Sequence, residues 1–523
     1  MLDVRIRGGL VVDGARAPRD CDVGIEGERI CAVGKGLGRA RRSIDARGKV
    51  VMPGFIDMHT HSDFTIPIRP SAEAKLLQGI TTDVTGNCGF SPFPLVGHDG
   101  DRHHGEFFEP ELSERWQSFA AFADDVGTRA LGINLAPLVG LGAVRLAVLG
   151  EADVRADERA LAEMGKCLRQ ALREGAFGAS SGLVYAPSSF ADTEELRSLA
   201  AIIADENGIY ATHIRDEGAG LLDAIEEAID VSRSSGCRLQ ISHLKALGRA
   251  QWGSIGAVLE RIDRANDEGN DVWADVYPYT AGSTSLTSLL PAAALDGGEE
   301  AFTRRLLDRA ERSRLALALE SNSSFALDDV VLAVVPGHPE LGGRRVSELA
   351  AADGLGPAEV ILRLLERNGA RASMVAFGMA ETDVDAVVSH PRTLFGSDGW
   401  TMTVDAVSYA HPRNFASSIR LLSRYVRDRR TLDLSQAVAK LAYLPSRRLG
   451  LLERGEISTG AIADVVVLDL AQLSEESTFE APCHYPRGVE HVLVAGEAAI
   501  EHGQITGARA GRVLRRAQGV EAA

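Results

Sequence analysis

The sequence predicts an α/β protein: a TIM-like (β/α)8 barrel with a small β-sandwich domain formed from both chain ends. Through the middle of the chain, extended apolar runs alternate with amphipathic helical patterns, which is typical of parallel β/α units. Both chain ends instead carry short extended runs separated by glycine turns, without helical periodicity. Several central runs end in His or Asp, as expected where the strand ends of a barrel build a site.

The chain of 523 residues is too long for one ordinary domain. We expect residues 1–50 and 451–515 to form the two halves of the β-sandwich, because the ends of a domain often lie close together. Residues 51–450 then form the barrel. The β/α alternation breaks near residues 284–350, which predicts an inserted subdomain on the side that shapes substrate access.

Eight runs are predicted as barrel strands: 51–59, 81–86, 133–139, 177–183, 209–214, 239–244, 272–279 and 393–397. A ninth run, 373–379, either replaces the seventh strand or belongs to the insertion. Helices are predicted between the strands, and those near 194–207 and 218–234 are amphipathic.

Charge and composition favour a small-molecule partner. The net charge of −17 and the pI near 5.3 argue against nucleic acid and anionic membrane surfaces as partners. The six cysteines are scattered, which suits a reducing cytoplasm, and the N-terminus lacks the apolar core of a signal peptide. The apolar stretch 131–150 contains Asn134, Pro137 and Arg145, so no membrane-spanning helix is predicted and a cytoplasmic location is expected.

Metal-ligand side chains stand at the ends of the predicted strands. His59 and His61 alternate with Thr60, so on a strand they point to one side, although this spacing alone fits a half-buried surface pair equally well. His213, His243 and Asp398 end three further runs. Imidazoles together with a thiolate are a typical zinc set, and Cys88 follows the second predicted strand.

Each of these residues also has an ordinary structural role. A free Cys is usually a small buried hydrophobic residue, but Cys88 stands between Gly86-Asn87 and Gly89 at the mouth of the predicted barrel. Asp398 can cap a helix as well as act in catalysis. The remaining histidines lie in polar loops, the insertion or the terminal domain and are predicted to be solvated or locally hydrogen bonded: His98, His103, His104, His338, His390, His411, His484, His491 and His502.

The chain resembles the N-acyl-D-amino-acid deacylase (D-aminoacylase) family of the amidohydrolase superfamily. The motifs that carry the resemblance span nearly the whole chain: GFIDMHTHSD at 54–63, TGNCG at 85–89, GASSGLVYAP at 178–187, THIR at 212–215, SHLK at 242–245, DVYPYTAGST at 275–284, GSDG at 396–399 and GAIADVVV at 460–467.

The resemblance implies a tightly held zinc ion on Cys88, His213 and His243, with His59 and His61 forming a second, weaker metal position. It also implies that Asp398 is the general base. A related subgroup that includes dihydroorotases and hydantoinases bridges two metals with a carbamylated lysine on the fourth strand, but the predicted strand 177–183 contains no lysine.

The resemblance further implies that Lys245, Arg413, Tyr277 and Ser283 hold the α-carboxylate of the substrate. Lys245 follows His243 by two residues and is one of only six lysines, so we expect it to face the same side. Arg413, taken by itself, is typical of a surface ion pair. Tyr185 is a hypothetical donor to the oxyanion, with plain packing as the alternative.

The sequence therefore predicts zinc-dependent hydrolysis of the amide bond of N-acyl-D-amino acids. A neutral or apolar side chain is favoured, because residues 286–294 contain no arginine for a second substrate carboxylate. After Arg413 the stretch 414–418 departs from the family pattern, which leaves the fit of that segment open. Alternatives are an amidohydrolase acting on D-dipeptides or cyclic amides, and a non-catalytic scaffold that keeps the barrel.

Overall fold

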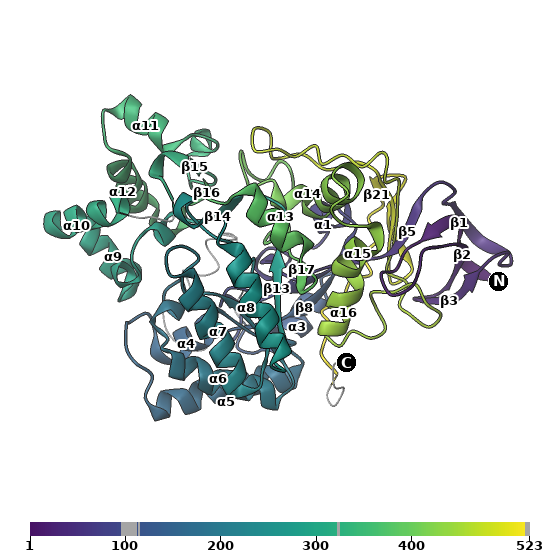
Figure 1. Cartoon of the computed structure of the whole chain (residues 1–523), viewed down its shortest axis with the longest axis horizontal. Coiled ribbons are helices and arrows are strands. Elements are labelled where there is room, and N and C mark those ends of the chain that lie inside the picture. The colour runs from purple at the N-terminus through teal and green to yellow at the C-terminus, as the bar shows by residue number, and fades with distance from the viewer. Residues whose placement is uncertain (96–111, 113, 115, 322–324, 518–523) are drawn as a thin grey trace.

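The computed structural model describes residues 1–95, 112, 114, 116–321 and 325–517, and its centre is a β/α barrel (Figure 1). Eight strand positions run parallel: β6 (Phe55–Asp57), β7 (Ile80–Thr85), β8 (Asn134–Pro137) continued by β9 (Val139–Gly140), β10 (Gly178–Gly182), β11 (Ile209–His213), β12 (Arg238–Ile241), β13 (Val272–Val276) and β17 (Thr393–Phe395).

The barrel closes on itself through its first and last strands. One sheet has the order β6-β7-β8 and the other the order β17-β13-β12-β11-β10-β9. The Met58 N–H, just past β6, donates to the carbonyl oxygen of Phe395 in β17 at 3.1 Å and joins the two sheets. The predicted barrel is therefore confirmed, and its parallel strands bring their carboxyl ends to one face.

The helices of the barrel follow the predicted amphipathic patterns. Helix α6 begins after Asp192, whose side chain accepts from the Glu195 N–H, and α7 buries Leu221, Ile225 and Ile229. The helices outside the insertion are α1 (Glu73–Leu76), α3 (Phe119–Gly127), α4 (Leu141–Leu149), α5 (Glu158–Glu174), α6 (Thr193–Asp205), α7 (Leu221–Ser235), α8 (Ile255–Asp267), α13 (Glu381–Ser389), α14 (Arg413–Arg420), α15 (Leu434–Val438) and α16 (Leu444–Arg448).

The predicted single strand 51–59 is wrong. The structure has two strands there, β5 (Val50–Pro53) in the terminal sheet and β6 in the barrel. Pro53 provides no N–H to continue a ladder, and a Cβ at Gly54 would lie 2.2 Å from the Thr81 Oγ1, so the backbone can pass this close only with glycine. The chain therefore changes sheets at this Pro-Gly pair.

Both chain ends form one nine-stranded sheet, as expected for the terminal β domain. Its order is β21-β20-β19-β18-β5-β1-β2-β3, with β4 paired to β1. A shared hydrophobic core joins Val23 and Ile25 from the start of the chain to Val465 and Val467 near its end. The strands are β1 (Leu2–Val11), β2 (Arg19–Glu26), β3 (Arg29–Gly34), β4 (Ala40–Asp45), β18 (Val465–Leu468), β19 (Val489–Val494), β20 (Glu497–Glu501) and β21 (Gln504–Ile505).

A second compact unit is inserted between β13 and β17. Its sheet has the order β14-β16-β15 and its separate hydrophobic core gathers side chains from residues 286–376. The ninth run belongs to this sheet as β16, antiparallel to both neighbours, and not to the barrel. The elements are β14 (Ala281–Ser285), β15 (Val330–Leu332), β16 (Ser373–Phe377), α9 (Gly298–Leu307), α10 (Arg309–Glu320), α11 (Val346–Asp353) and α12 (Pro357–Asn368). In Figure 1 its helices and the terminal sheet lie at opposite ends of the long axis.

Among the described residues, no helix is both long enough and apolar enough to cross a membrane.

Candidate metal centre and active site

The five predicted ligands meet at the carboxyl ends of four barrel strands. His59 and His61 follow β6, Cys88 follows β7, His213 is the last residue of β11 and His243 follows β12. All five are buried. The two histidines near β6 lie beyond the strand, with His61 preceding a 3-10 turn (Ser62–Phe64), so strand alternation is not what makes them face the same site.

Three imidazoles surround the Cys88 thiol. Its Sγ lies 3.3 Å from His59 Nε2, 3.7 Å from His213 Nδ1 and 3.4 Å from His243 Nε2. A tetrahedral zinc ion with Zn–S of about 2.3 Å and Zn–N of about 2.0 to 2.1 Å separates sulfur and nitrogen ligands by about 3.6 Å. The observed separations cluster around that value, so this set of donors fits zinc.

The environment of Cys88 favours the thiolate that a metal requires. Burial by itself disfavours the thiolate, but the imidazoles of His59 and His243 outweigh burial, and hydrogen bonds from His213 and His243 add to them. Together they hold the pKa of Cys88 well below its ordinary value.

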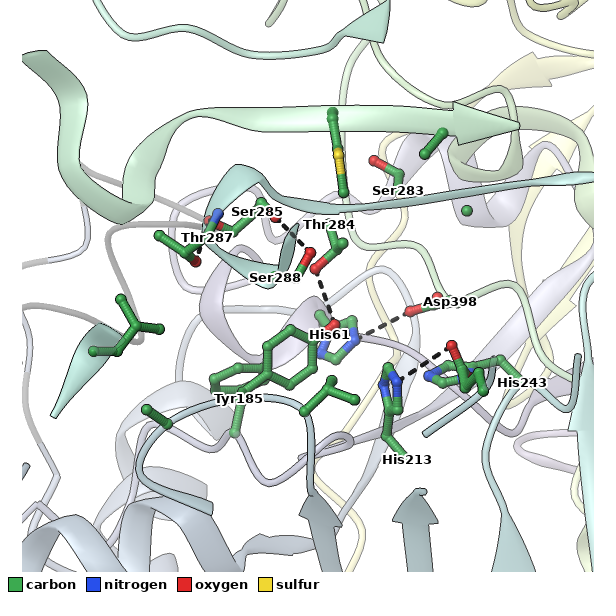
Figure 2. Close-up of a pocket in the computed structure, with 18 of the residues that line it drawn as sticks. His61, Tyr185, His213, His243, Ser283, Thr284, Ser285, Thr287, Ser288 and Asp398 are labelled. Carbon is green, nitrogen blue, oxygen red and sulfur yellow. Dashed lines mark hydrogen bonds and ion pairs between the residues drawn. The ribbon is translucent and has the colours of Figure 1, made fainter. Parts of the chain in front are cut away.

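A second group forms around Asp398, which follows β17. Its Oδ1 lies 3.2 Å from His61 Nε2 and 3.7 Å from His59 Nε2. His59 thus stands between the thiol and the carboxylate, and the three residues His59, His61 and Asp398 could also hold a cation. Figure 2 shows His61 and Asp398 joined at the same cavity as His213 and His243.

Three residues of this centre have a strained backbone. Cys88, His243 and Asp398 have positive φ angles of 53°, 34° and 53°, a region that side-chain-bearing residues seldom adopt. The turn that carries Cys88 also needs its glycines: a Cβ at Gly86 would lie 2.1 Å from the Leu138 carbonyl oxygen. The surrounding barrel therefore enforces these conformations at the residues that face the ligand set.

Two cations flank one tyrosine ring beside the metal ligands. Lys245 Nζ lies 5.8 Å from the centre of the buried Tyr277 ring, and the Arg413 guanidinium carbon lies 5.1 Å from it. Arg413 Nη1 pairs with Asp398 Oδ2 at 2.7 Å, and its Nη2 donates to the carbonyl oxygen of Ser283 at 3.0 Å.

Two of the sequence-based expectations for these cations are corrected. Arg413 is not a surface residue in a loop: it is 2% exposed and is the first residue of α14. Lys245 faces the site as expected, but β12 ends at Ile241, so its direction comes from the loop. The alternation of side chains along a strand therefore does not extend to Lys245.

Burial of Asp398 opposes its ionisation, yet the Arg413 guanidinium and a hydrogen bond from His61 outweigh burial and hold the pKa of this carboxyl well below its ordinary value. The carboxylate is therefore the form present at neutral pH.

Tyr185 and Ser283 stand at the wall of the cavity. The Tyr185 hydroxyl pairs with Thr284 Oγ1 at 2.9 Å, and its ring lies edge-on to His213 with centroids 5.2 Å apart. Ser283 is on β14 of the inserted sheet. The inserted unit thus contributes directly to the cavity, as Figure 2 shows for Ser283, Thr284, Ser285, Thr287 and Ser288.

Sequence reasoning assigned no role to two buried carboxylates that touch the ligands. Asp275 Oδ1 lies 3.2 Å from His59 Nδ1, and Glu217 contacts both His213 and His243. Asp275 lies in a recognised motif without an assigned role, whereas Glu217 stands outside every motif. Its position four residues after His213, in the same strand-end loop, is the one signal that could have indicated it.

Among the other histidines, His411 is buried and not solvated. Its Nε2 pairs with the carbonyl oxygen of Ala281 at 2.9 Å, and its Nδ1 accepts from the Arg413 N–H at 3.0 Å. It therefore ties the start of α14 to β14. His98, His103 and His104 lie outside the described residues.

A closed β/α barrel with a buried nitrogen and sulfur ligand set beside a carboxylate defines the class of metal-dependent barrel hydrolases. Comparison with known proteins supports this class. Residues 42–500 match the model of the Amidohydrolase family. The chain is also 37% identical over 519 residues to an N-acyl-D-glutamate deacylase of Alcaligenes xylosoxydans xylosoxydans, covering 98% of this chain and 97% of that protein.

Two solved structures are similar over almost the whole length. One is a D-aminoacylase with a binuclear metal centre, 34% identical with a TM-score of 0.85, covering 99% of this chain and 100% of that chain. The other is an N-acyl-D-glutamate deacylase from Bordetella bronchiseptica in complex with zinc and a phosphonate inhibitor, 33% identical with a TM-score of 0.85, covering 98% and 99%. The chain belongs to the amidohydrolase family, and within it to the D-aminoacylase group.

Proposed function

We propose that this protein is a zinc-dependent hydrolase that cleaves the amide bond of N-acyl-D-amino acids with neutral or apolar side chains. The products are a carboxylic acid and the free D-amino acid. The observation that supports the proposal is the contact of the Cys88 thiol with His213 and His243, beside Asp398, which is paired with Arg413. The D configuration rests on the relatives, which act on D-amino acid derivatives.

Cys88, His213 and His243 would hold the tight zinc ion, and His59 and His61 the weaker position. A bound zinc ion supplies a nucleophile at neutral pH by lowering the pKa of water, and it polarises a carbonyl as a Lewis acid. Asp398 accepts the proton of the attacking water and returns it to the leaving nitrogen, because an amide does not expel a bare amine anion. The Tyr185 hydroxyl, at the cavity wall, is the proposed additional donor to the oxyanion.

Lys245 and Arg413 would hold the α-carboxylate of the substrate over Tyr277, with Ser283 beside them. The Arg413 Nε is buried and has no hydrogen-bond partner among the described residues, so it remains available to an anionic ligand. A guanidinium fork and an ammonium group that both lie near the Tyr277 ring make a suitable carboxylate site.

The composition of the cavity wall supports a neutral or apolar substrate side chain. Among the described residues that line the cavity, Lys245 and Arg413 are the only lysine and arginine, and both are assigned to the α-carboxylate. The outer wall is mostly apolar or carries hydroxyl groups, and its two carboxylates, Glu151 and Glu299, would repel an acidic substrate side chain. Its apolar side chains are Leu247, Leu295, Phe302, Phe325 and Met374. In the described part of the wall no further lysine or arginine faces a second substrate carboxylate, in spite of the similarity to a D-glutamate deacylase.

A substrate panel tests the proposal. The zinc-loaded protein should hydrolyse N-acetyl-D-leucine at least tenfold faster, in kcat/KM, than N-acetyl-L-leucine, N-acetyl-D-glutamate, hydantoin or a D-dipeptide. Preference for hydantoin or a D-dipeptide would establish the corresponding alternative. Stoichiometric zinc with no turnover on any amide would indicate a scaffold that has kept the barrel without its chemistry.

A further inference from the structure

Phe90 and Tyr185 form an aromatic pair in the wall of the cavity. Phe90 comes two residues after Cys88, Tyr185 follows β10, and the centres of their rings lie 5.0 Å apart. The Phe90 ring has no role in the hydrolysis described above, and Tyr185 contributes only its hydroxyl group. The faces of these two rings are therefore a part of the cavity whose ligand is still to be assigned.

The aromatic pair and the two cations lie on different sides of the metal ligands. The centre of the Tyr277 ring, beside the cations, lies 6.5 Å from that of His243. The centre of the His213 ring lies 4.3 Å from that of His243 and 5.2 Å from that of Tyr185. Figure 2 shows the same order, with Tyr185 on one side of His213 and His243 on the other. The ligand cluster therefore lies between the cations and the aromatic pair.

The surface around the aromatic pair is apolar. Ala186 and Pro187 line the cavity directly after Tyr185. The Tyr185 hydroxyl is paired with Thr284 Oγ1 at 2.9 Å, so the ring offers mainly carbon atoms to a ligand. The only lysine and arginine among the described lining residues both lie near Tyr277. An apolar group therefore suits the surface around the pair, whereas an anion would meet neither lysine nor arginine there.

A planar trans amide fixes the direction in which each half of the substrate extends. The acyl chain and the α-carbon lie on opposite sides of the C–N bond. When the amide carbon stands at the ligand cluster and the α-carboxylate at Lys245 and Arg413, the acyl chain extends away from these cations. On the opposite side of the cluster it meets Phe90 and Tyr185.

We propose that Phe90 and the Tyr185 ring form a subsite for the acyl group, and that this subsite selects an unbranched aliphatic acyl chain longer than acetyl. This inference rests on the proposed function, because the proposed carboxylate site sets the direction of the substrate. The cavity has an empty volume of about 1390 Å³, its open mouth included, so a chain longer than acetyl finds room. The two rings are tilted by 47° and form a bent surface, which a flexible chain follows better than a rigid ring does.

Two variants of Phe90 and one control test the subsite. Phe90→Ala removes one of the two rings, and Phe90→Leu keeps part of its apolar volume. Phe325→Ala is the matched control, because Phe325 is also a partly buried phenylalanine of the cavity wall but packs against the core of the inserted unit. Since Phe90 lies close to Cys88 in the chain, the zinc content of every variant is measured before the kinetics.

The readout is the kcat/KM for N-hexanoyl-D-leucine divided by that for N-acetyl-D-leucine, a ratio from which a general loss of folded or zinc-loaded protein cancels. We expect the wild type to favour the hexanoyl substrate by about tenfold or more, since each buried methylene group adds to binding. The ratio should fall by about tenfold in Phe90→Ala and by less in Phe90→Leu. It should keep its wild-type value in Phe325→Ala.

A wild type that favours the acetyl substrate would overturn the inference, as would an unchanged ratio in Phe90→Ala or an equal fall in Phe325→Ala. If neither compound is turned over, their dissociation constants from calorimetric titration of the zinc-loaded proteins provide the same comparison. Absent turnover would then contradict the proposed function, while the affinities decide the acyl subsite. Turnover with no dependence of the ratio on Phe90 would contradict the subsite alone.

Discussion

At the scale of single residues, the proposed hydrolysis depends on Asp398 being both ionised and correctly oriented. Arg413 holds one carboxylate oxygen at 2.7 Å and His61 lies 3.2 Å from the other. These partners keep the carboxylate charged in a buried site, where it would otherwise be costly. The same partners fix its direction toward the ligand cluster. A base that is held this way can act on a water or a substrate nitrogen without moving far.

Asp398→Asn should retain zinc and lose turnover by about 100- to 10,000-fold, because the amide cannot accept the proton that the carboxylate takes. Zinc content by elemental analysis and kcat on N-acetyl-D-leucine provide the measurement. Near-normal kcat in a zinc-loaded variant would remove the proposed base.

Lys245→Met retains the aliphatic stem but removes the charge beside Tyr277. We expect KM for N-acetyl-D-leucine to rise by about tenfold or more, since a buried charge-assisted hydrogen bond contributes roughly 1.5 to 3 kcal/mol. The matching D-leucinamide derivative lacks the carboxylate and should be hydrolysed by variant and wild type with similar kcat/KM. An equal effect on both substrates would contradict carboxylate recognition by Lys245.

The sequence could indicate the histidines, Cys88 and Asp398 because these residue types are rare at the ends of apolar runs. It gave only a weak signal for Glu217, its position four residues after His213, because acidic residues in loops are common and few of them reach two histidines. Arg413 was misplaced for a related reason: a charged residue after a proline is usually exposed, and its burial depends on Asp398, which is adjacent only in the folded chain.

At the scale of elements, the site depends on short turns whose backbone is set by the barrel. The turn Gly86 to Gly89 brings the Cys88 thiol into the ligand set, and a Cβ at Gly86 has no space beside the Leu138 carbonyl. The start of β17, the strand that leads to Asp398, is held by a buried lysine. Lys440 is 6% exposed and donates a hydrogen bond to the carbonyl oxygen of Thr393 at 2.8 Å.

Gly86→Ala should reduce both zinc affinity and thermal stability, because it adds a clash with backbone to the cost of a positive φ. Gly48→Ala is the control: Gly48 has a similar φ of 77°, but no atom lies within 4 Å of its added Cβ. The control should lose only about 1 to 2 kcal/mol of stability and no zinc affinity. Equal zinc affinity in the two variants would show that the Cys88 turn tolerates adjustment.

Lys440 predicts a specific dependence of stability on pH. Burial lowers its pKa to about 7, whereas the unfolded chain has a lysine pKa of about 10.4. Between these values the unfolded state binds more protons, so this group makes the free energy of unfolding rise with pH, by up to about 1.4 kcal/mol per pH unit.

Lys440→Met should remove that contribution. The difference in unfolding free energy between wild type and variant should therefore grow in favour of the wild type from pH 7 to pH 9.5, as measured by denaturant unfolding. A difference that stays constant over this range would mean that Lys440 remains protonated in the folded protein.

At the scale of the whole molecule, residues distant in sequence come together in the terminal sheet and in the site. The terminal sheet pairs β18 with β5, and the site combines ligands that follow strands β6 to β12 with Asp398, which follows β17. The alternating pattern of the sequence was enough to predict the barrel and the shared terminal sheet. It was not enough to assign β16, since a buried strand of an inserted sheet has the same apolar pattern as a barrel strand, and pairing decides between them.

Removal of zinc should lower the thermal stability of the molecule, because the proposed ligands come from separate strands and a bound ion stabilises the folded state alone. The midpoint of thermal unfolding should fall by several degrees after treatment with a chelator and return on addition of zinc. Glu195→Gln should show the same dependence on zinc, since its ion pair lies away from the ligands. An unchanged midpoint in the wild type would mean that no ion bridges these strands.

The most direct test of the central claim is a titration of the zinc-free protein with zinc while the hydrolysis of N-acetyl-D-leucine is followed. We expect turnover to be absent without zinc, to rise in proportion to added metal and to reach its maximum near one equivalent, whereas Cys88→Ser should not reach this maximum. Full turnover in the zinc-free protein, or no turnover at any zinc content, would contradict the central claim.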